Sequence, residues 1–299
     1  MVGEIPDDIE RLVAEREERR AAREFAEADA LRERVHEAGF EIEDGPQGPR
    51  VHRLASSSRR VPPHLVESLI QNPPQFDVSV QWLVQGWPED VVRGIGAFRR
   101  HHPSRSVQHV VVDAAGTDPE RWPEDVELVA LDRDPGWGAG RNAGLKRGAG
   151  RVVVVVDSSV EPSGDVLTPL ERALTDPAVG VVGPVGAVTA DLEQFHPSDG
   201  PEVDAVEGYL MAFRREVVAQ AGLFDERFRF YRAADLEMSF RIRDLGYVAL
   251  AVPVPIERHE HRIWSSTPEP ERARLSKRNY NRFLERWRGR IDLCTGKPG

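Results

Sequence analysis

The chain has 299 residues, of which 40% are hydrophobic, and a formal net charge of −10 at pH 7. This composition suits one large or two small soluble domains, and the net acidity disfavours binding to nucleic acid through the overall field. The longest apolar run, residues 152–156, is much shorter than the roughly 20 residues of a membrane span, and the polar N-terminus lacks a targeting signature. A single cysteine, Cys294, excludes an intrachain disulfide framework and a cysteine zinc site. We therefore expect a cytoplasmic protein without a membrane span.

The first 55 residues predict a small unit of their own. Apolar residues recur at helical spacing over residues 9–13 and 25–35, with arginine and glutamate between them. Gly39 is a plausible helix stop. Residues 40–52 alternate like two short strands around a glycine- and proline-containing turn. This pattern predicts a helical hairpin followed by a β-hairpin.

The remainder of the chain predicts an α/β domain. Serines and prolines over residues 56–76 indicate a linker with one short helix. Beyond it, strands are expected at residues 78–84, 107–113, 126–131 and 152–157, and helices at residues 89–100 and 140–147. The nearly continuous valine run is typical of a strand buried on both faces of a parallel sheet, and the alternation predicts a doubly wound sheet. Residues 263–299 are expected to form a helical tail with a basic helix at residues 269–288.

Five segments in order resemble motifs of the family 2 glycosyltransferases. They are residues 110–118, 138–144, 157–159, 208–215 together with 222–226, and 235–247. The resemblance spans roughly residues 77–262 and implies a GT-A fold, in which a mostly parallel sheet is flanked by helices. It also implies transfer of a sugar from a nucleotide-diphosphate donor to an acceptor, which the sequence leaves unknown.

The donor side departs from the family pattern at its metal site. GT-A enzymes usually hold a divalent cation with carboxylates to stabilise the leaving diphosphate. The resemblance places Asp157 at the first aspartate of a DxD motif, but Ser159 replaces the second and offers only a neutral, weaker ligand. His259 and His261 are either further ligands for Mn²⁺ or Mg²⁺ or ordinary polar surface.

Other donor-side residues have two interpretations each. The resemblance implies donor binding by Asp113, Gly138, Arg141, Asn142, Asp157 and Ser159. Asp113 could accept a hydrogen bond from the base or cap the turn that follows it. Gly138 could approach the phosphates or only shape a loop. Arg141 or Arg262 could neutralise the diphosphate in place of a metal ion.

An inverting transfer also needs a general base for the acceptor hydroxyl. The resemblance places Asp235 at the catalytic position, whereas Ala234 replaces the preceding glutamate and Glu237 the later aspartate. Asp235 could alternatively cap the helix that it begins. Glu207, Gly208 and Glu237 are predicted on the acceptor side.

The N-terminal segment resembles a different family. Residues 25–32, Gly39 and residues 43–48 are similar to the C-terminal tail of cysteinyl-tRNA synthetases, although no HIGH-type motif or zinc set accompanies them. This resemblance implies tRNA or a protein as the partner of residues 1–55. Two alternatives to a glycosyltransferase therefore stay open. One is a binding or scaffold protein weakened by Ser159 and Ala234, and the other is a protein associated with tRNA or a synthetase.

Overall fold

The computed structural model describes residues 6–38, 40–45, 48–53, 60–123 and 125–296. The chain divides into two compact units, Met1–Arg60 and Val61–Gly299. Within the described residues, no helix combines the length and the apolar content that a bilayer crossing requires.

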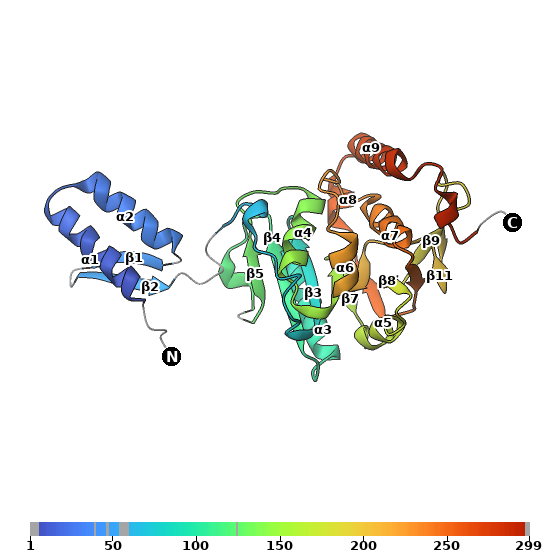
Figure 1. The fold of residues 1–299 in the computed structure, drawn as a ribbon, viewed down its shortest axis with the longest axis horizontal. Coiled ribbons are helices and arrows are strands. Elements are labelled where there is room, and N and C mark those ends of the chain that lie inside the picture. Colours follow the sequence, from blue (N-terminus) through green and yellow to red (C-terminus); the bar gives the residue numbers. More distant parts are fainter. Residues whose placement is uncertain (1–5, 39, 46–47, 54–59, 124, 297–299) are drawn as a thin grey trace. The chain divides into compact units, whose positions relative to one another are not determined.

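The N-terminal unit consists of two helices and a β-hairpin (Figure 1). Its elements are α1 (Asp7–Ala21), α2 (Phe25–Glu37), β1 (Phe40–Gly45) and β2 (Gly48–Arg53), with β1 and β2 antiparallel. Its core contains Ile9, Val13, Val35, Phe40 and Ile42. The buried Arg16 donates to both carboxylate oxygens of Asp44 at 2.9 Å, which lowers the pKa of Asp44 to about 2 and ties α1 to the hairpin. The predicted helices and hairpin are confirmed, and the predicted stop at Gly39 lies outside the described residues.

The larger unit is built on an eight-stranded mixed sheet in the order β11-β14-β8-β13-β6-β3-β4-β5. These strands are β3 (Phe76–Val84), β4 (Val107–Asp113), β5 (Glu127–Ala130), β6 (Gly150–Val156), β8 (Val179–Gly183), β11 (Glu202–Val203), β13 (Leu210–Arg214) and β14 (Val248–Ala251). Four neighbouring strands, β6, β3, β4 and β5, are parallel, and β13 runs antiparallel between β6 and β8. Small strands form two further sheets: β7 (Val160–Pro162) with β15 (Ile256–Arg258), and β9 (Gly186–Val188) with β10 (His196–Ser198) and β12 (Ala205–Val206).

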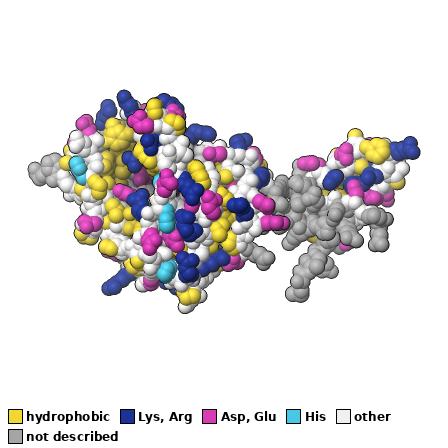
Figure 2. Space-filling model, turned by 180° about the vertical axis from the view of Figure 1, so that it is seen from behind, with side chains coloured by type: hydrophobic (Ala, Val, Ile, Leu, Met, Phe, Trp, Pro, Cys, Tyr) yellow, Lys and Arg dark blue, Asp and Glu magenta, His cyan; other side chains and the backbone are white. Residues whose placement is uncertain are grey.

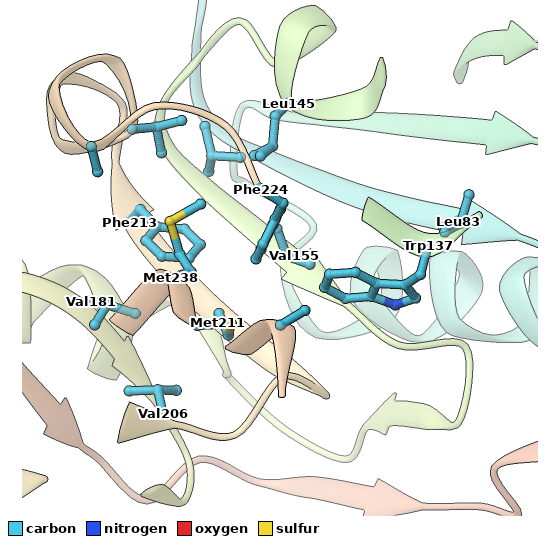
Figure 3. Close-up of a cluster of buried hydrophobic side chains, with 14 of the residues drawn as sticks. Leu83, Trp137, Leu145, Val155, Val181, Val206, Met211, Phe213, Phe224 and Met238 are labelled. Carbon is cyan, nitrogen blue, oxygen red and sulfur yellow. The ribbon is translucent and has the colours of Figure 1, made fainter. Parts of the chain in front are cut away.

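Helices cover both faces of this sheet (Figure 1). They are α3 (Pro88–His101), α4 (Trp137–Arg147), α5 (Leu167–Ala173), α6 (Arg215–Ala221) and α7 (Ala234–Asp244). The unit also contains α8 (Arg262–Ser266), α9 (Glu269–Trp287) and short 3-10 turns at Pro63–Leu65, Pro119–Arg121 and Ile291–Leu293. Side chains of α4, α6 and α7 share one apolar cluster, part of which Figure 3 shows, and side chains of α3 and α5 share the other.

The valine run of β6 explains why both faces are covered. Val153 and Val155 belong to the cluster under α4, whereas Val152, Val154 and Val156 belong to the cluster under α3. Alternate side chains of a strand point to opposite faces, so an all-apolar strand requires a cover on each side. The predicted central, doubly covered sheet is therefore confirmed.

Segments on either side of the predicted α/β core lie against it. Val61, from the predicted linker, donates its N–H to the carbonyl of Ala130 at 2.8 Å. At the other end, α9 packs on α7 through a cluster that includes Phe240, Phe283 and Trp287. Cys294 is buried in the same cluster, and burial raises the pKa of its thiol to about 11, so it is held as an inert thiol.

Candidate active site

Asp157 lies at the carboxyl end of β6, the edge at which open α/β sheets bind ligands. Its Oδ1 accepts hydrogen bonds from the N–H of Ser159 at 2.9 Å and from the Ser159 hydroxyl at 2.6 Å. Its Oδ2 lies 3.3 Å from Nε2 of His261. Burial alone would raise the pKa of Asp157, but the hydrogen bonds and charges of His261, Ser159 and Arg141 outweigh it and lower that pKa. The site therefore holds an ionised carboxylate.

The structure brings His261, but not His259, to this carboxylate. Nδ1 of His261 accepts the backbone N–H of Trp264 at 3.1 Å, so this imidazole caps α8. The proton of the neutral ring is thereby assigned to Nε2, which faces Asp157. His259 instead directs Nε2 to the Glu161 carboxylate at 2.9 Å.

Asp113 ends β4, beside β3. Its oxygens accept the N–H of Ala115 at 3.0 Å, the N–H of Thr117 at 2.8 Å and the Thr117 hydroxyl at 3.1 Å. The side chain is fully buried. The turn-capping interpretation thus accounts for contacts to both oxygens.

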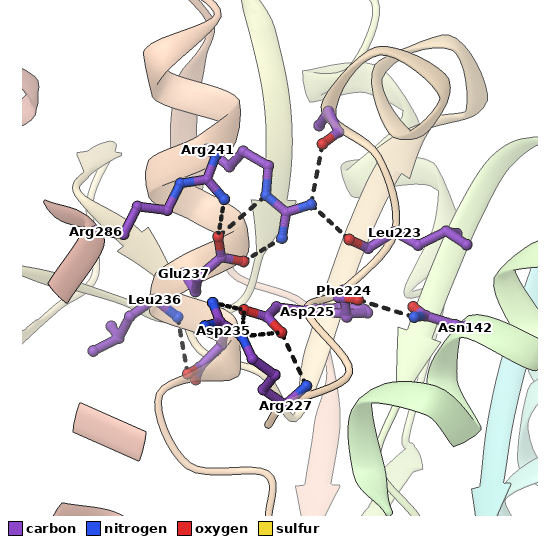
Figure 4. A network of polar contacts seen from close by, with 11 residues as sticks. Asn142, Leu223, Phe224, Asp225, Arg227, Asp235, Leu236, Glu237, Arg241 and Arg286 are labelled. Carbon is purple, nitrogen blue, oxygen red and sulfur yellow. Dashed lines mark hydrogen bonds and ion pairs between the residues drawn. The ribbon is translucent and has the colours of Figure 1, made fainter. Parts of the chain in front are cut away.

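The first turns of α4 hold neighbouring segments in place. Gly138 lies against the turn after α6, where an added Cβ would come within 2.8 Å of the Asp225 carbonyl. Asn142 donates to the Phe224 carbonyl at 2.9 Å (Figure 4). These contacts explain why a glycine and an amide occur at those two positions.

Neither of the two arginines considered for the diphosphate is free in the structure. The buried Arg141 donates to the carbonyls of Val156 at 3.0 Å and Gln81 at 3.3 Å, and burial lowers its pKa to about 10. It lies beneath Asp157 as a buried positive charge. Arg262 pairs with Asp90 at 3.0 Å and, on the same helix α3, with Glu89.

Asp235 lies in the first turn of α7. Its Oδ2 accepts the N–H of Gly208 at 2.9 Å. Its Oδ1 accepts the N–H of Leu236 at 3.0 Å (Figure 4). The residue before the helix is Ala233, at φ 64°, so Asp235 is not the N-cap. Burial raises the pKa of Asp235, and the two N–H groups oppose this effect only in part.

The loop of residues 207–209 contacts both Asp157, through its backbone, and Asp235, through its side chain. The N–H of Asp157 donates to the carbonyl of Tyr209 at 2.8 Å, and the preceding residue, Gly208, binds Asp235. Glu207 lies in the same loop, and burial together with the nearby Asp235 charge raises its pKa. Three predicted residues, Glu207, Gly208 and Asp235, are therefore neighbours.

Glu237 points elsewhere. It is buried and pairs with Arg241 and, at 2.9 Å, with Arg286 of α9 (Figure 4). Arg241 also donates to the carbonyls of Ala221 and Leu223. The side chain thus joins α7 to α9 and to the end of α6, away from the loop at Gly208.

Aromatic and arginine side chains that the sequence motifs did not single out surround the site. The Tyr231 ring lies 4.4 Å from that of His261, and the Arg258 guanidinium lies 3.9 Å from the centre of the Tyr209 ring. Arg232 and Arg272 flank Trp264. Their signal in the sequence is the density of arginine and aromatic residues over residues 227–232 and 258–272.

Few side chains at the site could coordinate a cation. Within the described parts of the chain, no three His, Cys, Asp or Glu side chains gather in a group that could hold a metal ion. Asp157 and His261 form a pair, which is compatible with a cation that takes its other ligands from water and phosphate oxygens.

Comparisons with known proteins agree with this architecture. Residues 108–236 match the family model for glycosyl transferase family 2. The fold is similar to that of GalNAc-T7 with UDP, GalNAc and Mn²⁺ (TM-score 0.57, 16% identity, 74% of this chain and 49% of that one). It is also similar to the mannosyltransferase PcManGT from Pyrobaculum calidifontis with GDP-Man and Mn²⁺ (TM-score 0.54, 19% identity, 77% of this chain and 71% of that one).

The N-terminal segment matches cysteine–tRNA ligases. That of Chlamydia caviae is 47% identical over 51 residues, which are 17% of this chain and 11% of the ligase. That of Cupriavidus taiwanensis is 47% identical over 53 residues, which are 18% of this chain and 12% of the ligase. The chain thus spans about a tenth of the length of the curated relatives it matches. Residues 108–236 carry a glycosyl transferase family 2 domain on a GT-A fold, preceded by a segment related to the C-terminal region of cysteine–tRNA ligases.

Proposed function

We propose that the larger unit transfers a sugar from a nucleotide-diphosphate donor to an acceptor hydroxyl, with Asp235 as the general base. The observation that carries this proposal is the loop of residues 207–209, which binds Asp157 on one side and Asp235 on the other. One short loop thereby contacts the backbone of the donor-side aspartate and the side chain of the base, at the ligand-binding edge of the sheet.

Asp235 suits the role of base in its environment. Burial raises its pKa, which makes the carboxylate a stronger base. The N–H groups of Gly208 and Leu236 fix its orientation. A fixed base with a raised pKa accepts the hydroxyl proton more readily than a solvated aspartate does.

Asp157 and His261 would hold a divalent cation on the donor side. A bound cation would neutralise charge on the leaving diphosphate. An imidazole suits Mn²⁺ better than Mg²⁺, and Nε2 must release its proton before it can act as a ligand. Because Ser159 contributes a hydroxyl instead of a second carboxylate, we expect weaker cation binding than a two-carboxylate site gives.

Donor binding and hydrolysis test this function. Calorimetry with UDP-, GDP- and dTDP-linked sugars, with and without Mn²⁺, should detect one donor, and slow donor hydrolysis should be lost in Asp235→Asn. Asp176→Asn is the matched control, because Asp176 also accepts a backbone N–H but is exposed. It lies just before the N-terminal end of β8, whereas Asp157 follows the C-terminal end of β6. Absence of donor binding under every metal condition, or wild-type hydrolysis in Asp235→Asn, would rule the proposal out.

A second candidate is a binding protein on the same fold that no longer turns over its donor. Ser159 and Ala234 favour it, since each replaces a carboxylate that the resemblance implies. The same experiment separates the two candidates, because a binding protein would bind the donor without hydrolysing it.

We also propose a tRNA or protein partner for the N-terminal unit. Its relatives are cysteine–tRNA ligases, although acidic residues (15) outnumber basic ones (11) in residues 1–60. On the face of the molecule in Figure 2, acidic and basic side chains intermingle over the larger unit. Filter binding of tRNA by the full chain and by a chain lacking residues 1–60 tests an RNA partner, and equal binding by both would exclude this segment as the site.

A further inference from the structure

Three arginines from separate elements surround the acceptor side of the site. Arg258 ends β15, Arg232 precedes α7 and Arg272 belongs to α9. Arg258 stacks on the Tyr209 ring, while the guanidinium groups of Arg232 and Arg272 lie 5.7 and 4.6 Å from the centre of the Trp264 ring. The sheet edge therefore carries a group of cations next to its carboxylates.

These arginines are poorly neutralised in comparison with others in the unit. In the described part of the chain, neither Arg232 nor Arg272 forms an ion pair, and Arg258 reaches Glu207 only at 3.9 Å. By contrast, Arg262 and Arg241 each hold a carboxylate closely. Arg272 additionally has a buried Nε without a hydrogen-bond partner. Its Nη1 donates to the Trp264 carbonyl at 3.2 Å. Guanidinium groups that have no carboxylate partner and lie beside an aromatic ring are suited to an anionic group of planar or tetrahedral shape.

Two of these cations, Arg232 and Arg258, lie near the base side of the site, where Arg258 approaches Glu207 to 3.9 Å. The charges of Arg232 and Arg258 partly offset the rise in the pKa of Glu207, and Arg232 does the same for Asp235. Trp264 is partly exposed and contacts the edge of Tyr231, whose ring lies on His261. A molecule resting on Trp264 would therefore be near both the base and the donor-side carboxylate.

We propose that the acceptor carries an anionic group, a phosphate or a carboxylate, which Arg232 and Arg272 bind beside Trp264 while its hydroxyl faces Asp235. This inference rests on the proposed glycosyl transfer. In that reaction the acceptor oxygen forms a bond to the anomeric carbon, the bond from that carbon to the diphosphate oxygen breaks with its electron pair, and Asp235 takes the hydroxyl proton. The anionic group takes no part in the bond changes and serves to position the acceptor.

Binding of small matched probes tests the proposal. Glycerol, glycerol 3-phosphate and glycerate share hydroxyl groups and differ in their anionic group, and calorimetry on the full chain measures each. We expect glycerol 3-phosphate or glycerate to bind at least about ten-fold more tightly than glycerol, with an affinity that falls as salt rises. The tighter of the two identifies phosphate or carboxylate as the preferred group.

Variants then locate the site. Arg232→Gln combined with Arg272→Gln should remove the preference for the charged probe, whereas Arg151→Gln should retain it. Arg151 is a fair control because it is 65% exposed and lies at the beginning of β6, at the opposite edge of the sheet. Thermal unfolding of each variant confirms that it is folded.

Several results would overturn the inference. They are equal binding of glycerol and the charged probes, no detectable binding of any charged probe, an unchanged preference in the double variant, and competition between UDP or GDP and the charged probe. The last result would assign the arginines to the donor. Donor binding measured on the same preparations tests the proposed function separately. If no donor binds, the binding of the charged probes can still be interpreted.

Discussion

At the scale of single residues, the site depends on which polar atoms face Asp157 and Asp235. Asp157 is held ionised by His261 and Ser159, whereas burial makes Asp235 more basic. The pKa of Asp157 is therefore lowered and that of Asp235 is raised. Such opposite shifts are expected when Asp157 binds cationic groups and Asp235 takes up a proton.

The pH dependence of donor hydrolysis should reflect the raised pKa of Asp235. The base works only when ionised, so the rate should fall as pH falls through that pKa. We expect the acid limb above about pH 3.9, the ordinary value for aspartate. The pKa of Asp157 is lowered, so Asp157 stays ionised over this limb. A pH–rate profile measures the limb, and a midpoint at or below the ordinary value would contradict the assignment.

His261→Ala should destabilise the protein more than His259→Ala. Loss of His261 leaves a buried carboxylate with fewer partners, at a cost of about 1–3 kcal/mol, whereas the exposed pair of His259 and Glu161 contributes about 0–1 kcal/mol. The pKa of Asp157 is lower in the folded protein than in the unfolded chain. The stabilisation from its ionised carboxylate is therefore complete at pH values above the unfolded pKa and is lost as the pH falls through the folded pKa. Urea unfolding at pH 7 compares the variants, and equal losses would argue against the Asp157–His261 contact.

Gly208→Ala should impair hydrolysis while leaving the fold intact. An added Cβ would lie 3.0 Å from Cβ and 3.2 Å from Oδ2 of Asp235, so the carboxylate must shift. The contacts require a shift of a few tenths of an ångström. Because a displacement of about 1 Å at a reacting group can reduce the rate on the order of 100-fold, we expect a smaller loss than that. Gly96→Ala on α3 is the control, since its new methyl group would meet only the end of Arg100 at 3.6 Å. An undiminished rate in Gly208→Ala would show that Asp235 tolerates the shift.

At the scale of elements, strands were more predictable from the sequence than loops and helix faces. The valine run before Asp157 required a central strand covered on both faces, so the position of this carboxylate followed from local pattern. The role of Glu237 was less predictable, because its side chain pairs with Arg286, which belongs to α9 and is distant in the sequence. Likewise, His261 reaches Asp157 and His259 does not, because His261 is the residue that caps the start of α8, and packing determines where this helix begins.

The network of Glu237 predicts a structural effect. Glu237→Ala leaves Arg241 largely buried without its carboxylate, which should cost on the order of 3 kcal/mol. Denaturant unfolding measures this loss, and the affinity for donor in the folded fraction should change little. Unchanged stability together with weakened substrate binding would instead return Glu237 to the acceptor side.

At the scale of the whole molecule, the chain combines two units with separate cores. The core of the first is made of residues from α1, α2 and its hairpin, and the apolar clusters of the second begin at Val66. The sequence indicated this division through its change from helical periodicity to alternating strands and helices. What it did not indicate is the group of arginines at the site, because they come from three elements and only folding assembles them.

Removal of residues 1–60 should leave the larger unit folded. Its thermal unfolding temperature and donor affinity should match those of the full chain, because each unit buries its own apolar side chains. Differential scanning calorimetry of both chains makes the comparison. A large drop in the transition temperature of the shortened chain would show that the second unit needs the first.

The loop of residues 207–209 has a consequence for how such a protein can diversify. Two successive residues of this loop, Gly208 and Tyr209, contact the Asp235 carboxylate and the backbone N–H of Asp157, so one short stretch of backbone helps to position both residues. Substitutions among the surrounding arginine and aromatic side chains can therefore accumulate without altering these two backbone contacts. Descendants of this chain could exchange one acceptor for another through surface changes alone, while the reaction centre is inherited unchanged.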